Sequence, residues 1–169
     1  MLSIIEVSME NIQLINVKSQ DASFLFRLMN NVSILSVLNE VPTTVNDWSN
    51  AITEWETDPD EEDYIIFDNS IPIGWIGING LETINGTVYI KIIALLPKYQ
   101  NKGIGTYAVS KIINELKCRN YTRIALYTDK TNIRAQQCYF NCGFKYCSEV
   151  TQKMSNGATI IRVRMERDL

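Results

Sequence analysis

Hydrophobic positions along the chain show two periodicities, and each predicts one kind of element. Short alternating or β-branched apolar runs predict strands at 11–18, 64–67, 71–78, 87–96, 123–128, 144–153 and 158–165. Apolar residues recurring every three or four positions predict helices after Asp21, over 32–38, around 48–55, from Gly105 to Leu116 and after Asn132. Together they predict an α/β chain whose mixed, mostly antiparallel sheet has helices on both faces.

Turn and cap residues separate these elements. Hairpin turns are expected at 68–70, at Asn85-Gly86 and at 155–157, because Asn and Gly accept the backbone angles of tight turns. The last helix has Thr131 or Asn132 as its N-cap and Gly143 as its C-terminal glycine. A length of 169 residues predicts one domain covering residues 1–169.

The stretch 90–108 joins a strand, a loop and a helix start. Pro97 ends the strand because it cannot donate to a sheet ladder, and Gln100-x-x-Gly103-x-Gly105 follows. The first N–H groups of a helix have no partner within it and carry the positive end of the helix dipole. Such a helix start holds a phosphate without a basic side chain. The stretch therefore predicts a pyrophosphate-bearing cofactor.

Two other interpretations of the same glycines are open. They are also typical of an ordinary strand-to-helix turn. In addition, residues 103–108 fit the G-x-G-x-x-A fingerprint of NAD-type dinucleotide binding, with Asp129 ending the next strand about 20 residues on. The loop after Leu96 is too long for that tight turn, and too little chain remains for further parallel βαβ units. Dinucleotide binding is thus the weaker interpretation.

Composition narrows the function classes. The chain is 46% hydrophobic, but no apolar run reaches membrane-spanning length, so we expect a globular protein without membrane partners. The first residues lack the basic start and long apolar core of a signal peptide, which favours a cytoplasmic location. A net charge of −3 argues against nucleic acid as the main partner.

The chain has no histidine and four cysteines, at 118, 138, 142 and 147. In a cytosolic chain these are expected to be free, mostly packed thiols, and no metal site is expected because further ligands are missing. Without histidine, Ser-His and Cys-His catalysis are excluded. Any acid–base chemistry then depends on carboxylates, tyrosine, lysine or water.

Seven carboxylates gather in the segment Glu54–Asp63. A solvated loop between a helix and the next strand is the favoured interpretation. The alternative is an acidic rim that attracts a cationic acceptor. Nearby, Trp48 and Trp55 are expected to pack in the core or line a groove rather than stack on bases.

Two motifs carry a resemblance to a known family. They are Gln100-x-x-Gly103-x-Gly105 and Asn132-x-x-Ala135-x-x-x-Tyr139-x-x-x-Gly143-Phe144. With these motifs spaced across one βαβ unit, nearly the whole chain resembles the GCN5-related N-acetyltransferase (GNAT) family. The resemblance implies a GNAT fold with a sheet of six to seven strands. It also implies a protein that is a monomer or a homodimer. It also implies transfer of an acetyl group from acetyl-CoA, as co-substrate, to a primary amine of a small molecule or peptide.

The resemblance also implies positions for the cofactor. Parallel strands 87–96 and 123–128 would splay apart to admit it, and Asn132 would hydrogen-bond its arm. Backbone groups of one strand would meet the acetyl carbonyl and the pantetheine arm; these are Ile93, Ala94 and Leu95. The loop would wrap the pyrophosphate with the N–H groups of Asn101, Lys102, Gly103, Ile104, Gly105 and Thr106.

Tyr139 would lie near the sulfur and protonate the departing thiolate, because its hydroxyl is uncharged at neutral pH. The general base departs from the family pattern, because the places where many relatives carry an acid hold Tyr89, Lys91 and Tyr127. Glu82, Asp129 or water could replace it. A catalytically silent acyl-CoA sensor or interaction module is the alternative function. The acceptor cannot be identified, since its pocket comes from the variable first helices and the last hairpin.

Overall fold

A computed structural model of the chain describes residues 7–84 and 86–169. Its strands are β1 (Ile12–Asn16), β2 (Glu61–Asp68), β3 (Ile71–Asn79), β4 (Thr87–Leu95), β5 (Arg123–Asp129), β6 (Lys145–Lys153) and β7 (Thr159–Asp168). Its α-helices are α1 (Ala22–Met29), α2 (Val32–Leu38), α3 (Val45–Trp55), α4 (Ile104–Cys118) and α5 (Ile133–Asn141). Short 3-10 helices cover Met9–Asn11, Ser19–Asp21 and Pro97–Tyr99. The predicted strands and helices are confirmed, with ends that differ by a few residues.

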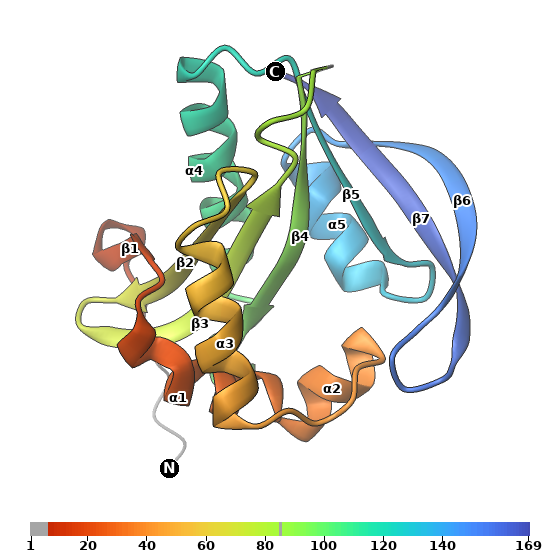
Figure 1. Ribbon diagram of the computed structural model, residues 1–169. Coiled ribbons are helices and arrows are strands. Elements are labelled where there is room, and N and C mark those ends of the chain that lie inside the picture. The colour runs from red at the N-terminus through yellow and green to blue at the C-terminus, as the bar shows by residue number, and fades with distance from the viewer. Residues whose placement is uncertain (1–6, 85) are drawn as a thin grey trace.

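The strands form one sheet in the order β1-β2-β3-β4-β5-β7-β6 (Figure 1). All neighbours are antiparallel except β4 and β5, which are parallel. Parallel neighbours need a long crossover connection, and α4 lies within it. The predicted mixed, mostly antiparallel sheet is therefore confirmed.

Hydrophobic side chains cover both faces of this sheet. On one face, Ile66 and Ile76 pack with the buried side of α4 and with Tyr139 of α5. On the other face, Ile65 and Trp75 pack with α1, α2 and α3. Neighbouring residues of one strand thus belong to two clusters, because successive side chains point to opposite faces. Helices on both faces, as the sequence predicts, follow from this alternation (Figure 1).

The ends of α5 are fixed by capping residues. Of the two candidate N-caps, Asn132 is the one: its side-chain oxygen accepts a hydrogen bond from the N–H of Ala135 at 3.1 Å. At the other end Gly143 has φ +81°, and the N–H of Phe144 reaches the carbonyl of Tyr139 at 3.0 Å. This is a Schellman motif, which confirms the predicted C-terminal glycine.

The hairpin turns agree with the sequence where they are described. Asn69 has φ 54° between β2 and β3, and Gly157 has φ +87° between β6 and β7. In the predicted Asn85-Gly86 turn, Asn85 lies outside the described residues and Gly86 has φ +66°. These left-handed angles are those that Asn and Gly tolerate best.

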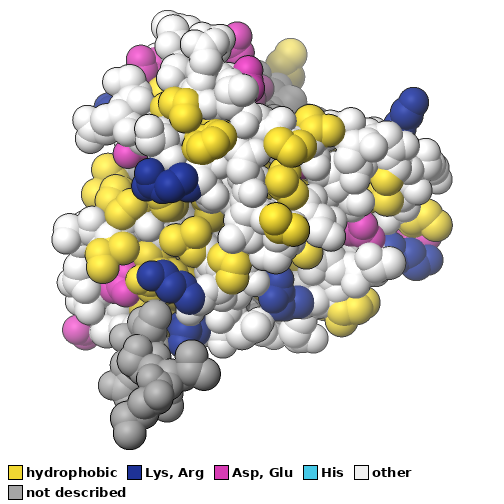
Figure 2. All heavy atoms as spheres, turned by 90° about the horizontal axis from the view of Figure 1, so that it is seen from below, with side chains coloured by type: hydrophobic (Ala, Val, Ile, Leu, Met, Phe, Trp, Pro, Cys, Tyr) yellow, Lys and Arg dark blue, Asp and Glu magenta, His cyan; other side chains and the backbone are white. Residues whose placement is uncertain are grey.

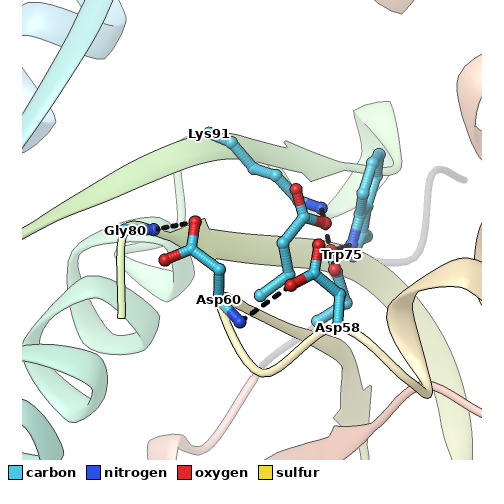
Figure 3. A network of polar contacts seen from close by, with 7 residues as sticks. Asp58, Asp60, Trp75, Gly80 and Lys91 are labelled. Carbon is cyan, nitrogen blue, oxygen red and sulfur yellow. Dashed lines mark hydrogen bonds and ion pairs between the residues drawn. The ribbon is translucent and has the colours of Figure 1, made fainter. Parts of the chain in front are cut away.

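The acidic segment is only partly the solvated loop that the sequence favours. β2 already begins at Glu61, and Asp63 is only 5% exposed. Asp60 accepts a hydrogen bond from the N–H of Gly80 at 3.1 Å (Figure 3) and another from the N–H of Glu82 at 2.8 Å. Carboxylates that leave water need donors of this kind. The loop prediction is therefore wrong from Glu61 onward, where β2 begins.

The four cysteines are free thiols, but Cys118 and Cys147 are exposed rather than packed. Within residues 7–84 and 86–169, no helix is long and apolar enough to cross a membrane. The same ranges contain no group of three or more His, Cys, Asp or Glu side chains placed to hold a metal ion.

Candidate functional site

A cleft of about 990 Å³ opens where β4 and β5 separate. Their parallel pairing runs from Thr87 opposite Arg123 to Ile90 opposite Leu126. Both strands continue beyond the last pair, β4 to Leu95 and β5 to its own end. The separated strands, the start of α4, α5, α2 and the β6–β7 hairpin line the cleft. Because β5 no longer pairs with it, this end of β4 presents a backbone edge to the cleft.

Helix α4 directs its N-terminus at the cleft. Its N-cap is Gly103, with φ +79°, a left-handed angle that favours glycine. Asn101, Gly103, Gly105 and Thr106 line the cleft wall. The first N–H groups of the helix lack partners within it and carry a partial positive charge. The wall is therefore suited to an anionic group.

Of the other residues predicted to bind the cofactor, three line the cleft and two do not. Ile93, Ala94 and Leu95 line the cleft along the open edge of β4. Ile104 is fully buried in the core, and Lys102 is not part of the described lining, so these two could contribute only backbone groups or long-range charge. The loop is tied to β4 by Gln100, whose Nε2 donates to the carbonyl of Leu95 at 2.8 Å.

Asn132 and Tyr139 bring the second motif to the same cleft, at the two ends of α5. Tyr139 is 6% exposed, and its ring lies 5.8 Å from that of Phe144. Burial raises the pKa of Tyr139 well above its ordinary value, so its hydroxyl is protonated at neutral pH. A protonated hydroxyl in the cleft wall can supply a proton or a hydrogen bond.

Asp129 is the one carboxylate among the described residues that line the cleft. Its Oδ1 accepts from the N–H of Thr131 at 2.7 Å and from its hydroxyl at 2.8 Å, while Oδ2 accepts from the Asn39 amide at 3.3 Å. Glu82, the other candidate base, is not among the cleft residues. It lies in the loop between β3 and β4, where its backbone N–H donates to Asp60. The structure thus brings Asp129 to the cleft, but not Glu82.

A β-bulge places Lys91 in the cleft wall. The β3–β4 register shifts beside Gly77, so Lys91 is an extra residue in β4. A Cβ at Gly77 would lie 2.3 Å from Oδ1 of Asp63 and 2.5 Å from Cε of Lys91, so only glycine fits here. Sequence reasoning missed this arrangement. The available signal was a glycine in the middle of an apolar strand.

Two carboxylates outside the cleft lining form ion pairs with the ammonium of Lys91 (Figure 3). It lies 2.5 Å from Oε2 of Glu61, 2.8 Å from Oδ2 of Asp63 and 4.3 Å from the ring centroid of Trp55. Burial raises the pKa of Asp63 even though Lys91 acts to lower it. No residue of the segment 54–63 lines the cleft. Five of its carboxylates bind Lys91, Arg119 or backbone N–H groups instead, so the segment does not form the rim of the cleft.

Helix α2 and the β6–β7 hairpin both line the cleft, and the turn of the hairpin lies beside the end of α2 (Figure 1). The N–H of Val41 donates to Oγ of Ser155 at 3.2 Å, and the N–H of Asn156 donates to the carbonyl of Asn39 at 3.3 Å. Most of their side chains in the cleft are apolar; they are Ile34, Val37, Leu38, Met154 and Ile160. Figure 2, a view from the α2 end, shows hydrophobic side chains spread over this face with Lys and Arg between them.

Arg162 is a further cleft residue that sequence reasoning did not assign to the site. Its guanidinium donates to the backbone carbonyl of Tyr127 and, through Nη1, to Gln152 at 3.1 Å. Burial lowers the pKa of Arg162, yet its positive charge still acts to lower the pKa of Tyr139. A fixed cation therefore lies within electrostatic reach of the Tyr139 hydroxyl.

Solved structures share this fold over nearly their whole length. Spermidine N-acetyltransferase from Vibrio cholerae, in complex with CoA and spermine, has a TM-score of 0.84 and 21% identity, covering 94% of this chain and 96% of its own. The microcin C7 self-immunity acetyltransferase MccE, in complex with acetyl-CoA and AMP, has a TM-score of 0.83 and 21% identity, covering 100% and 98%. At such identities the likeness shows the fold, and it confirms the predicted architecture.

Comparisons at the level of sequence identify the family of the chain. N-alpha-acetyltransferase 30 from Xenopus laevis is 32% identical over 77 residues, which are 46% of this chain; the chain spans only 28% of that relative's length. The model of the acetyltransferase (GNAT) family matches residues 33–144, well over half of the chain. That stretch contains both motifs that build the cleft walls. The chain belongs to the acetyltransferase (GNAT) family.

Proposed function

We propose that the protein transfers the acetyl group of acetyl-CoA to a primary amine of a small molecule or peptide. One observation carries the proposal: the N-terminus of α4 and the open edge of β4 meet in a single cleft. An anion-binding helix start beside an extended backbone edge matches a ligand with a pyrophosphate at one end and an amide-containing arm at the other. CoA and acetyl-CoA in the neighbouring structures support this choice.

In this proposal the pyrophosphate lies against the loop from Asn101 to Thr106, held by backbone N–H groups that include those of Lys102 and Ile104. The pantetheine arm runs along Ile93–Leu95 and hydrogen-bonds with that edge as an added strand would. Asn132 contacts the arm from the start of α5. Each of these contacts uses backbone or amide groups, so the cofactor is bound without a buried charged side chain.

The reaction is a direct attack. The nitrogen lone pair of a neutral amine adds to the thioester carbonyl, a C–N bond forms, and the C–S bond breaks with its electron pair on sulfur. Tyr139 gives its hydroxyl proton to that thiolate, and Arg162 offsets the phenolate charge until solvent returns a proton. The proton lost by the amine goes to Asp129 or to water.

A second candidate, a catalytically silent acyl-CoA-binding module, has one observation in its favour. The only carboxylate of the described cleft lining, Asp129, already accepts three hydrogen bonds. A carboxylate has about four acceptor positions, so three of them are occupied before an amine approaches. This module would keep the α4 and β4 contacts and lack turnover.

An amine panel distinguishes the two functions. The protein is incubated with acetyl-CoA and, separately, with polyamines, peptide α-amines, lysine-containing peptides and amino sugars, while free thiol and acetylated product are followed. The transferase predicts thiol release that requires one class of amine and equals the acetylated product. A silent module predicts binding of acetyl-CoA in calorimetry with no amine-dependent thiol, and that pair of results would overturn the proposal.

A further inference from the structure

Arg162 of β7 and Asp129 of β5 lie directly opposite each other in the sheet, and both line the cleft. Side chains of opposite residues project from the same face, where opposite charges attract. These two form no ion pair. The carboxylate of Asp129 accepts instead from Thr131 and from the amide of Asn39, while Arg162 donates to neutral groups. A positive and a negative charge are therefore held apart in one cleft.

The guanidinium of Arg162 has neutral partners only. It donates to the backbone carbonyl of Tyr127 and to Gln152 at 3.1 Å, and no carboxylate within residues 7–84 and 86–169 forms an ion pair with it. Two of its five N–H groups serve these bonds, so three are available. A partly buried cation loses hydration and needs an anion to offset that loss. The position therefore favours an anionic group of a ligand.

Asp129 can accept one more hydrogen bond. Its Oδ1 accepts two from Thr131, whereas Oδ2 accepts one, from Asn39 at 3.3 Å. A carboxylate oxygen offers about two acceptor positions, so Oδ2 has one for an incoming N–H group. Because the Cα atoms of opposite residues are about 4.5–5.5 Å apart, one small molecule can reach both Asp129 and Arg162.

Apolar side chains adjoin both charged groups. Ile160 shares a face of β7 with Arg162, because side chains alternate along a strand. Leu38 precedes Asn39, whose amide donates to Asp129. Leu38 and Ile160 line the cleft, as do Ile34, Val37 and Met154. A ligand that meets the two charges therefore has an apolar surface beside it.

The charges of the cleft argue against a polyamine as the acceptor. Among the described residues its lining contains the cations Lys91, Arg134 and Arg162 but only one carboxylate, that of Asp129. Several ammonium groups would meet mostly like charges there, and the apolar wall offers them no hydrogen-bond acceptor. A molecule with one positive group, one negative group and an apolar part matches the cleft better.

We propose that the acceptor is an α-amino acid with an apolar side chain, whose carboxylate binds Arg162 and whose amino group binds Asp129. The inference rests on the proposed function and names its acceptor. The ammonium loses a proton to Asp129 or to water, and its nitrogen then attacks the thioester carbonyl. A C–N bond forms, the C–S bond breaks, and the thiolate takes the proton of Tyr139. The products are an N-acetyl amino acid and CoA.

Two amines that differ only in the carboxylate test the role of Arg162. Leucine and its decarboxylated form, 3-methylbutylamine, are compared by thiol release from acetyl-CoA. In wild type, kcat/KM for leucine should be roughly 100-fold higher, within the usual range for a desolvated charge pair. Arg162→Gln should abolish most of this preference by raising KM for leucine. Lys153→Gln, at an exposed residue of β6 outside the cleft lining, is the control and should keep the wild-type preference.

Comparing the preference between proteins removes the intrinsic reactivity of each amine, and a loss common to both amines belongs to the Tyr139 step. Equal kcat/KM for the two amines in wild type would overturn the inference, as would equal losses for both in Arg162→Gln. The wild-type comparison decides even if the variant does not fold. Alanine keeps both charged groups but little apolar surface, so its kcat/KM should be about 10-fold below that of leucine. Equal use of the two amino acids would contradict the apolar side chain.

The same amines separate this inference from the proposed function. Thiol release with polyamines or peptides but not with leucine keeps the transferase and overturns the amino-acid acceptor. If no amine releases thiol, the transferase fails, and calorimetry with leucine and 3-methylbutylamine decides the amino-acid site by itself. Binding of leucine alone, lost in Arg162→Gln, supports that site, whereas binding of both amines or of neither overturns it.

Discussion

The two walls of the cleft are assembled in different ways. The wall assigned to the cofactor comes from one continuous stretch, from β4 through the start of α4 to α5, and its contact groups are mainly backbone N–H and C=O. The opposite wall joins α2 to the β6–β7 hairpin, and Asn39 and Ser155, which are in contact there, are 116 residues apart in sequence. Local chain conformation builds the first wall, and tertiary contacts build the second.

This difference separates the two roles that a transferase needs. A backbone wall requires only glycines, caps and an open strand edge, so it recognises the same cofactor whatever side chains surround it. A wall of apolar side chains from two distant segments changes with each substitution, which suits it to choosing the acceptor. We therefore expect substitutions in the two walls to have separable effects.

The largest effect is expected at Tyr139, which lines the cleft from α5. Tyr139→Phe keeps the ring against Phe144 but removes the hydroxyl proton. In the proposed reaction kcat should fall by roughly 100-fold, the usual range for loss of one general acid, while acetyl-CoA affinity stays level. Steady-state kinetics combined with calorimetry measures both. Tyr146→Phe, at an exposed residue outside the cleft, is the control, and full turnover by folded Tyr139→Phe protein would assign the proton to water.

An added side chain should be tolerated less well at Gly77, beside the Lys91 bulge, than at Gly105 in the cofactor wall. Gly77→Ala forces a methyl group against Asp63 and Lys91, so we expect the free energy of unfolding to fall by about 1–3 kcal/mol. In a Lys91→Ala background the same change should cost less, because two of the three nearest atoms belong to Lys91. Urea unfolding of wild type, Gly77→Ala, Lys91→Ala and the double variant measures both losses of free energy in a double-mutant cycle. If Gly77→Ala lowers the free energy of unfolding equally in both backgrounds, the added methyl group does not clash with Lys91.

The acceptor wall is tested by two neighbouring residues of β7. Ile160 lines the cleft, whereas Ile161 points to the other face of the strand and is 44% exposed. Ile160→Ala should lower kcat/KM for the acceptor by roughly 10-fold without changing acetyl-CoA affinity. Ile161→Ala should change neither. A comparable loss of acetyl-CoA binding in Ile160→Ala would show that the two walls are not separable.

The smallest expected effect is a pH dependence behind the cleft. The pKa of Asp63 is raised in the folded state, so its carboxyl binds a proton more readily there than in the unfolded chain. Its contribution to stability is then fully present below the unfolded pKa and is lost as pH rises through the folded pKa. Asp63→Asn removes this titration. The stability of wild type relative to Asp63→Asn, from urea unfolding between pH 3 and 7, should fall as pH rises; an increase would contradict the shift.

The same contrast explains what the sequence could predict. Periodicity placed the strands and helices, and glycines and caps located the α4 loop and Asn132, because these depend on neighbouring residues. Lys91 reaches Glu61 and Asp63 only through a bulge and a 30-residue separation, and no local pattern encodes that contact. Arg162 and the choice between Asp129 and Glu82 likewise depend on which strand ends meet in space, so the sequence left them open.

Calorimetry of acetyl-CoA binding to Gly105→Val tests the central claim most directly. A Cβ at Gly105 makes only ordinary contacts, at 3.5 Å to Cys138 and 3.9 Å to Ile93, so the variant should fold, but its two methyl groups would occupy the cleft at the helix start. Asn114→Val, at an exposed site of the same helix, is the matched control. We predict roughly 100-fold weaker binding for Gly105→Val, about 2.7 kcal/mol, and wild-type affinity for the control. Equal affinity in folded Gly105→Val would contradict binding of the pyrophosphate at the N-terminus of α4.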